Sequence, residues 1–410
     1  MGRKYLYLLL CLYVLLPLSA KELYFKHVDL NDGFTQPSAI SIYQDTKGAI
    51  WFGNDNFNVY DGRIVRSFRL SNYLEEVEDN NIHGICGDGD SCIYMLANRR
   101  LVLFNMRTEE FRLTTVQAHA LEYHHGALFY ANRNELYRYK SNGVSEKICT
   151  LPDSTLIIRD LHFMNDGWLL ATTKGLYNYS GGTFQNLLED ESITSLFIDN
   201  WRRLWVGTLS NGAKVFSEGE WISLKENDAA HPLINNQVRT IDQDIKGNIW
   251  IGTYAGITVV NASLRDGYHL SHKEQVSWSL KHSSVYAIFR DRQGGMWVGT
   301  YYGGLSYFNP NTEDYTFYGI SPDDPESLNG FLFGKMTEDT KGNLYIATEH
   351  GRLNCLDRTT QKVKRFDSAL SHIPFRTTKS VWYDAENDRL YIGTFRHGLY
   401  CYSSSGHLKQ

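Results

Sequence analysis

The sequence contains little cysteine, and its cysteines do not form a recognisable framework. One of the 6 Cys, Cys11, lies within the first 20 residues, which leaves five in the rest of the chain. An odd number excludes a fully paired set of disulfides, although Cys86 and Cys92 flank the stretch GDGDS and leave one bridge open. No cysteine pair combines zinc-site spacing with suitable histidines, so no metal and no cofactor are expected.

The sequence also lacks an excess of positive charge. It has 41 Lys and Arg against 46 Asp and Glu, a formal net charge of -5. Nucleic-acid binding requires a basic field, so this chain is not expected to bind nucleic acid. Only 8 Pro occur beside 34 Gly, and aromatic residues make up 14% of the chain, which is typical of a globular protein rich in β-structure.

Long apolar runs are missing except at the N-terminus. Arg3 and Lys4 precede the run YLYLLLCLYVLLPL, and small residues follow up to Ala20, the layout of a secretory signal peptide over residues 1–20. Leu18 is not small, so the cleavage position stays open, and an uncleaved signal anchor is the alternative. No other stretch approaches the roughly 18 apolar residues of a membrane helix. The mature chain, with a net charge of -7 after loss of Arg3 and Lys4, is expected in the periplasm.

What the chain has in quantity is repetition. The stretch IDQDIKGNIWIGTYAGITVV, residues 241–260, has counterparts that begin at Ile42, Leu196, Ile288, Met336 and Val381. The position of Trp250 marks nine copies, three of them degenerate, at Trp51, Tyr94, Phe129, Leu169, Trp205, Trp250, Trp297, Tyr345 and Tyr391. Intervals of 35 to 48 residues between these positions indicate a repeat architecture.

Each copy predicts the same small sheet. An alternating run such as VRTIDQD predicts a first strand, and D-x-x-G predicts the turn after it, because Asp bonds its own backbone and Gly accepts a positive φ. IWIGT and GITVV predict the second and third strands, and a weaker fourth strand follows, as at Asp314–Gly319. A four-stranded sheet with two apolar faces must stack on copies of itself, which favours an all-β propeller over a solenoid.

The start of the mature chain predicts how the ring closes. LYFKHVDLNDGFTQPSAI is similar to DYTFYGISPDDPESLNGFLF, so the chain begins with a fourth strand that lacks its own sheet. Pairing of this strand with the last blade gives a seven-bladed β-propeller over residues 21–310. Residues 311–410 then hold two blades of an incomplete second propeller. A nine-bladed ring is the alternative, although more than eight blades are rare.

The repeat D-x-x-G-x-(I/L/M)-W-(I/V)-G-T-x-x-G-(I/L) resembles the two-component regulator propeller repeat. F-x-x-x-x-L-N-D-G-(F/L) after a signal sequence resembles the opening of hybrid two-component sensors of Bacteroides and relatives. The resemblance implies two seven-bladed propellers and a β-sandwich, then a membrane helix, a histidine kinase, a receiver and a DNA-binding module. It also implies sensing of oligosaccharides and control of glycan-utilisation genes. This chain departs from the pattern, since it ends at CYSSSGHLKQ without a second membrane segment or a phosphoacceptor helix. Kinase modules and any membrane attachment other than an uncleaved signal are therefore expected outside it.

Candidate ligand residues lie in the turns between second and third strands, which gather around the axis at one end of a propeller. They are Asp55, Asn56, Arg99, Arg100, Arg133, Asn134, Lys174, Asn211, Tyr254, Tyr301 and Tyr302. Arginines that clamp a carboxylate or sulfate, with aromatic faces for sugar rings, suit an acidic oligosaccharide. The alternative is that these are ordinary exposed turn residues. The sequence leaves open whether the chain forms a homodimer.

Other conspicuous residues have simpler explanations. The repeated aspartates, Asp45, Asp244, Asp291 and Asp339, lack the further carboxylates of a calcium loop and are expected to stabilise turns. The repeated tryptophans are expected to pack between blades rather than to bind sugars. No G-x-S-x-G elbow occurs, and the sialidase motif S-x-D-x-G-x-T-W is not matched, so no catalytic residue is assigned. A propeller hydrolase or lyase and a protein-interaction scaffold remain the competing functions.

Overall fold

The structure, a computed structural model, describes most of the chain. The described residues are 23–28, 38–53, 55–77, 81–140, 142–229, 232–274, 276–312, 315–321, 324–330, 332–366, 377–403 and 408–409, without the side chains of 352, 408 and 409. The predicted signal peptide lies outside these ranges. Two compact units divide the chain: unit 1 comprises Met1–His272 with Ser279–Glu313, and unit 2 comprises Lys273–Trp278 with Asp314–Gln410.

The described part of unit 1 consists of seven antiparallel sheets, numbered here in chain order. The first and second sheets are β2 (Ser41–Gln44), β3 (Ile50–Gly53), β4 (Phe57–Tyr60) and β5 (Val65–Phe68), then β6 (Ile82–Gly87), β7 (Cys92–Ala97), β8 (Arg100–Asn105) and β9 (Glu110–Gln117). The third and fourth are β10 (Ala120–His124), β11 (Ala127–Asn132), β12 (Glu135–Tyr139) and β13 (Ser145–Thr150), then β14 (Ile158–Met164), β15 (Gly167–Thr172), β16 (Gly175–Ser180) and β17 (Thr183–Glu189).

The remaining sheets of unit 1 follow the same order. The fifth is β18 (Ile193–Ile198), β19 (Leu204–Thr208), β20 (Ala213–Ser217), β21 (Glu220–Glu226) and a short parallel β22 (Pro232–Leu233). The sixth is β23 (Val238–Gln243), β24 (Ile249–Thr253), β25 (Gly256–Val260) and β26 (Gly267–Leu270). The seventh is β27 (Val285–Arg290), β28 (Met296–Thr300), β29 (Gly304–Phe308) and, as its fourth strand, β1 (Lys26–Val28). Two short 3-10 segments lie at Leu70–Asn72 and Pro310–Thr312.

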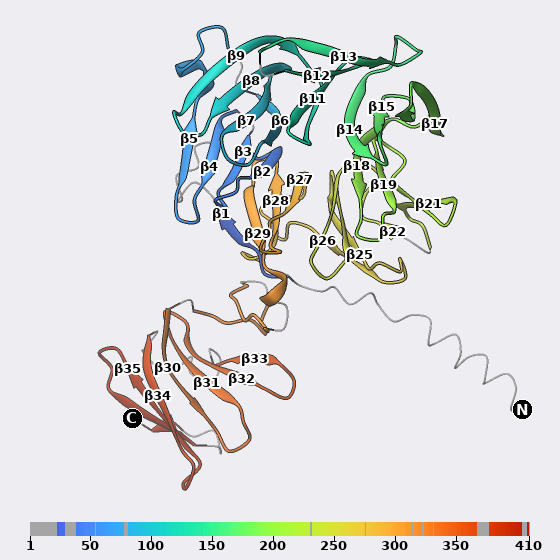
Figure 1. Cartoon of the computed structure of the whole chain (residues 1–410). Coiled ribbons are helices and arrows are strands. Elements are labelled where there is room, and N and C mark those ends of the chain that lie inside the picture. The colour runs from blue at the N-terminus through green and yellow to red at the C-terminus, as the bar shows by residue number, and fades with distance from the viewer. Residues whose placement is uncertain are drawn as a thin grey trace, which may run out of the picture. The chain divides into compact units, whose positions relative to one another are not determined.

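Unit 1 is a closed ring of these sheets. The first strand of each sheet lies against the first strand of the next, and β27 of the seventh sheet lies against β2 of the first. The N-terminal β1 pairs antiparallel with β29, from Lys26 opposite Tyr307 to Val28 opposite Leu305. Both ends of the unit 1 chain therefore meet in one sheet, as Figure 1 shows where blue β1 lies beside orange β29. The all-β propeller architecture predicted from the repeats is confirmed.

The apolar core of unit 1 lies between the sheets. Each of its seven clusters of buried side chains joins one sheet to its neighbour, including the cluster of Val28, Ile50 and Trp297 that joins the seventh sheet to the first. The repeated tryptophans lie in these clusters, and Trp205 and Trp250 are fully buried. The prediction that they pack between blades is confirmed. No single sheet has a core of its own, so the sheets depend on their neighbours for stability.

One buried aspartate orders the turn in each of the four repeats marked by a tryptophan. Asp244, which is fully buried, accepts bonds from the Asn248 backbone N–H (2.8 Å) and the Asn248 side-chain amide (2.9 Å) through its two oxygens. Its Oδ2 also accepts the Trp250 indole N–H at 3.0 Å. The same indole bond to an aspartate occurs at Trp51, Trp205 and Trp297. The predicted turn role is confirmed for Asp45, Asp244, Asp291 and Asp339, each of which accepts a backbone N–H of its turn. The bond to the tryptophan, which fixes the turn to the core, was not predicted.

The cysteines of the second sheet do not form the bridge that the sequence left open. Cys86 lies opposite Tyr94 and Cys92 lies opposite Asn105 across their strands, and both thiols are free. Residues that flank a turn at this spacing are offset along the hairpin, so their side chains do not meet. The hairpin is held instead by Asp88, whose Oδ1 accepts the backbone N–H of Ser91 at 2.8 Å.

The described part of unit 2 contains two further sheets. They are β30 (Leu332–Glu338), β31 (Leu344–Glu349), β32 (Arg352–Asp357) and β33 (Lys362–Arg365), then β34 (Thr378–Asp384), β35 (Arg389–Thr394), β36 (Leu399–Ser403) and β37 (Leu408–Lys409). A core with Ala347, Val381 and Ile392 joins them. In the last sheet, exposed Trp382 stacks on Tyr391 with ring centroids 5.5 Å apart.

The fourth strand predicted at Asp314–Gly319 is wrong in its described part. Residues 315–319 have no strand pairing, and only Ile320 forms an isolated bridge, with Leu328. The aromatic residue that suggested a strand, Phe317, packs edge-on against Trp278 at 5.1 Å, and Gly319 lies directly against the same indole. Side-chain packing on Trp278 thus replaces backbone pairing here. Among the described residues, no helix is long and apolar enough to cross a membrane.

The buried aspartate gives a direct test of this fold. Asp244→Ala leaves the Trp250 indole N–H and the Asn248 backbone N–H without their acceptor, and we expect a loss of about 3 kcal/mol in the free energy of unfolding of unit 1. The control is Asp153→Ala, because exposed Asp153 accepts only turn bonds from Thr155, and its expected loss is about 1 kcal/mol or less. Urea unfolding measures both, and equal losses would contradict the anchoring role of Asp244.

Candidate ligand-binding site

The predicted ligand residues lie at one end of the ring of unit 1. All eleven fall in or directly beside the turns between second and third strands, with Arg100 as the first residue of β8. In an antiparallel sheet the first strand starts at the end where the second strand stops, so the starts of the first strands share this end. The turns and these strand starts together form the surface called here the turn end.

A second set of side chains reaches the turn end through β-bulges. The register shifts at the start of five first strands, so each of these strands has one extra residue between two paired positions; these residues are His83, Arg159, Thr194, Arg239 and Tyr286. A bulge redirects a side chain and is common beside binding sites. None of the five was predicted. The signal was in the sequence, since each is the second residue of a repeated pattern, as in IHGI, IRDL, ITSL, VRTI and VYAI.

Aromatic side chains of the sixth and seventh sheets gather around one bulge residue. The Arg239 guanidinium lies 4.0 Å from the ring centroid of Tyr286 and 5.3 Å from that of Tyr254. Tyr301 lies 6.0 Å from Tyr286 and 4.2 Å from Tyr302, centroid to centroid. Tyr254 and Tyr302 are 56% and 60% exposed, so their rings face solvent although they are held in a group. We call Arg239, Tyr254, Tyr286, Tyr301 and Tyr302 the aromatic cluster.

Arg239 is fixed in position but keeps its charge available. Its Nη1 donates to Ser284 Oγ at 2.7 Å and to the Val285 carbonyl at 3.3 Å, both neutral groups. Within the described part of the chain, no carboxylate forms an ion pair with it. A guanidinium held between two rings and without an anionic partner is arranged to receive an anion.

The predicted Asp55 extends the aromatic cluster across the closure of the ring. It follows β3 of the first sheet, beside the seventh, and acts electrostatically on Tyr301. The pKa of Tyr301 is raised, chiefly by its hydrogen bond to Tyr302 and to a lesser degree by Asp55. Backbone N–H of Tyr302 also donates to Ser38 Oγ at 3.1 Å, in the segment that enters the first sheet.

A second set of predicted residues, which carry basic side chains, lies on the second and third sheets. Arg99 and Arg133 both act on His119, which precedes β10 at the place of the bulge residues, and its Nδ1 accepts the Arg133 backbone N–H at 3.3 Å. Partial burial first, and then the two arginines, lower the pKa of His119. Arg99 and Arg133 have φ of 65° and 52°, so their turns hold them in the left-handed region. The structure thus brings these two predicted residues together.

Four other predicted residues are already engaged by neighbouring loops. Arg100 pairs with Glu76 at 3.0 Å, and Lys174 lies 3.7 Å from Asp190. The remaining two use their side-chain amides, Asn211 to Glu191 and Asn134 to the Leu151 carbonyl. These residues hold the turns to the connections that precede or follow them, which is a structural role. No described segment combines three or more His, Cys, Asp or Glu side chains in a group that could hold a metal ion.

Acidic side chains on the first strands lie next to the axis. Asp160 Oδ2 accepts the Leu196 backbone N–H at 2.7 Å, and Asp242 Oδ2 accepts that of Arg290 at 2.7 Å, each from the following sheet. Burial raises the pKa of both carboxyl groups to about 6, although these hydrogen bonds lower it. These carboxylates satisfy backbone donors at the inner edge of the ring, so they join successive sheets.

Glu122 occupies the same place as Asp242 but is less well satisfied. Its Oε1 lies 3.6 Å from His162 Nδ1, and its Oε2 has no hydrogen-bond partner among the described residues. Burial, followed by the charge of Asp160, raises the pKa of Glu122 to about 8. Burial also lowers the pKa of His162, so near neutral pH the pair lies as two neutral groups.

Two segments of the chain match the model of the family described as two component regulator propeller, at residues 232–255 and 279–302. Each segment covers a first strand, a second strand and the turn that follows. The chain therefore carries two-component regulator propeller repeats, and the resemblance seen in the sequence is confirmed. All five residues of the aromatic cluster lie in these two segments. No curated protein sequence matches the chain.

Solved structures show the same fold. The extracellular domain of BT3049 of B. thetaiotaomicron, described as a hybrid two-component system, is 17% identical and superposes with a TM-score of 0.65 over 95% of this chain and 54% of its own. Two structures of the extracellular domain of BT4673 from the same organism, described in one case as a hybrid two-component system and in the other as a one-component system, are 19% and 18% identical with TM-scores of 0.60 and 0.59. Both cover 94% of this chain, which spans 59% of their length.

Glu122 predicts how the stability of unit 1 depends on pH. Because its pKa is raised in the folded state, its protonated form stabilises unit 1 at low pH, and this contribution is lost as pH rises from about 4.5 through about 8. The side chain in Glu122→Gln cannot ionise. Relative to the parent chain, the free energy of unfolding of this variant should therefore rise between pH 5 and pH 9 by on the order of a few kcal/mol. Thermal unfolding at several pH values measures this. The control Glu220→Gln changes an exposed carboxylate of β21 and should follow the parent; an unchanged pH dependence in Glu122→Gln would contradict the assignment.

Proposed function

We propose that this chain is the extracytoplasmic ligand-sensing region of a hybrid two-component sensor. Support comes from the two-component regulator propeller repeats and from the fold shared with extracellular domains of such systems. The ligand is an oligosaccharide bound at the turn end of unit 1. Binding controls glycan-utilisation genes through kinase modules that lie outside this sequence.

The observation that carries this proposal is the aromatic cluster. The exposed rings of Tyr254 and Tyr302 offer faces on which sugar rings stack, as aromatic side chains do in carbohydrate sites. Arg239, which lies over the rings of Tyr254 and Tyr286, presents an anion-binding fork without a carboxylate partner in the described structure. Stacking surfaces beside a fixed cation favour an oligosaccharide that carries a carboxylate or sulfate group.

The proposed class of function is tested with a panel of neutral and acidic oligosaccharides. Calorimetry on the chain should detect saturable binding of acidic members, and chromatography of the mixtures should show the sugars intact. Product formation would contradict the sensing role in favour of a hydrolase or lyase. Absence of binding across the panel would contradict it in favour of a protein-interaction scaffold.

The position of the anion is tested by Arg239→Ala. Loss of a charge-assisted hydrogen bond to the ligand should weaken binding of acidic oligosaccharides by about tenfold or more and leave neutral ones little changed. Arg265→Ala is the matched control, because exposed Arg265 lies in the same sheet between its third and fourth strands, at the opposite end of the ring. Calorimetry of both variants decides the point; equal affinities in all three proteins would contradict a role for Arg239.

A further inference from the structure

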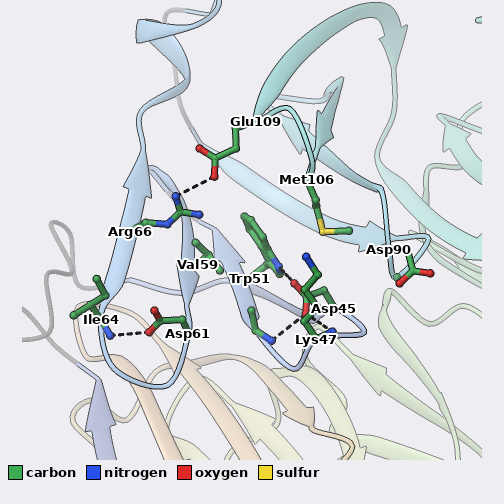
Figure 2. Close-up of a pocket in the computed structure, with 12 residues that line it drawn as sticks. Asp45, Lys47, Trp51, Val59, Asp61, Ile64, Arg66, Asp90, Met106 and Glu109 are labelled. Atoms are coloured by element: carbon green, nitrogen blue, oxygen red, sulfur yellow. Dashed lines mark hydrogen bonds and ion pairs between the residues drawn. The ribbon is translucent and has the colours of Figure 1, made fainter.

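A pocket of about 380 Å³ opens between the first and second sheets, at the end of the ring opposite the turn end. Most of its lining residues come from the turns after the first and third strands of both sheets, and Trp51, Val59 and Arg66 come from strands of the first sheet. Figure 2 shows its lining, which includes Asp45, Ala49, Trp51, Met106 and Glu109. None of these residues belongs to the candidate site above.

The repeat explains why this pocket exists. The residue four positions after the anchoring aspartate is Ala49 in the first sheet, after Asp45, and Arg203 in the fifth sheet, after Asp199. Both backbone N–H groups donate to their aspartate, at 3.0 Å and 2.9 Å, which establishes that the positions are equivalent. The long side chain present between the fifth and sixth sheets is missing between the first and second.

Arg203 shows what the filled space requires. Its Nε donates to Asp199 Oδ2 at 2.6 Å, and its Nη1 donates to the Ala262 carbonyl of the sixth sheet at 2.7 Å. The guanidinium lies 5.6 Å from the ring centroid of Trp205, over the indole that the same aspartate holds. It also lies 5.1 Å from the ring centroid of Trp201. A carboxylate, a carbonyl and two indole rings thus bind one guanidinium.

The pocket presents a carboxylate, a carbonyl and the tryptophan of its own sheet without the guanidinium, and Lys47 stands at the place of Trp201. Asp45 Oδ2 holds the Trp51 indole N–H at 2.9 Å, as Asp199 holds Trp205. Met106 stands at the place of Ala262. In the second sheet the repeat residue Tyr94 lies opposite Leu103, and Met106 follows three residues later. In the sixth sheet the repeat residue Trp250 lies opposite Val259, and Ala262 follows three residues later. In Figure 2, Asp45 and Trp51 lie at the centre of the pocket and Met106 on the side of the second sheet.

The charge of the lining also favours a cation. Its carboxylates are Asp45, Asp61, Asp90 and Glu109, and its cations are Lys47 and Arg66. Arg66 is paired with Glu109 at 3.0 Å. The surplus of carboxylates over cations attracts a positively charged group to a pocket with an aromatic floor.

We propose that this pocket binds the guanidinium group of an arginine, either as the free amino acid or within a peptide. The incoming guanidinium takes the place that Arg203 takes in the fifth sheet, bonded to Asp45 and the Met106 carbonyl and stacked on Trp51. This proposal does not depend on the sensing of oligosaccharides at the turn end.

The test is calorimetric titration of the whole chain at low ionic strength with arginine, methylguanidinium, the tripeptide Gly-Arg-Gly and citrulline. The guanidinium compounds should bind, and citrulline, which has the same shape without the charge, should bind at least tenfold more weakly. Tighter binding of the tripeptide than of arginine would identify a peptide as the source, and the reverse would identify the free amino acid. Absence of saturable binding by every guanidinium compound would overturn the proposal.

Ala49→Arg provides the matched variant, because it fills the pocket from within as Arg203 does between the fifth and sixth sheets. It should abolish guanidinium binding and keep the thermal midpoint of the parent or raise it, whereas Ala49→Ser should bind like the parent. Lys47→Met removes a competing cation and should tighten binding severalfold. Guanidinium binding that persists unchanged in Ala49→Arg would place the site elsewhere and overturn the proposal.

Discussion

Each sheet of this protein has two apolar faces, and burial of both is the constraint on which the rest of the structure depends. A four-stranded sheet cannot bury both faces within itself, so each covers the face of its neighbour. In unit 1 the seventh sheet packs against the first, because Val28 and Trp297 of the seventh sheet share a core with Ile50 of the first. Closure through β1 therefore removes the last open faces, and it leaves the two ends of the ring as the places where residues can vary.

The buried aspartate and its tryptophan connect this core to the ends of the ring. Asp244 accepts the backbone and side-chain N–H groups of Asn248 and the Trp250 indole N–H, so the turn is fixed to the core between the sheets. Neighbouring positions can therefore vary without loss of the turn. At the opposite end, bulges in the first strands aim Arg239 and Tyr286 at the surface in the same repeated way. The two proposed binding surfaces, one at each end of the ring, thus arise from substitutions within one repeat.

Much of this architecture could be predicted because its signals are local. Period-two runs, D-x-x-G turns and the spacing of tryptophans act over a few residues, so the sheets and the burial of Trp250 followed from the sequence. The bulge residue Arg239 was missed because a bulge is a relation between two strands. The role of Lys174 was uncertain because its partner, Asp190, belongs to the next connection. The strand expected at Asp314–Gly319 failed in its described part because the aromatic signal there reports packing on Trp278.

Closure of the ring by its N-terminal strand is the central claim, and native-state hydrogen exchange tests it most directly. The account predicts that the amides of β1 and β29 exchange as slowly as those of β24, through unfolding of unit 1 as a whole. The contradicting result is rapid exchange in β1 and β29 while the other six sheets remain protected, which would show that unit 1 is stable as an open array and needs no seal.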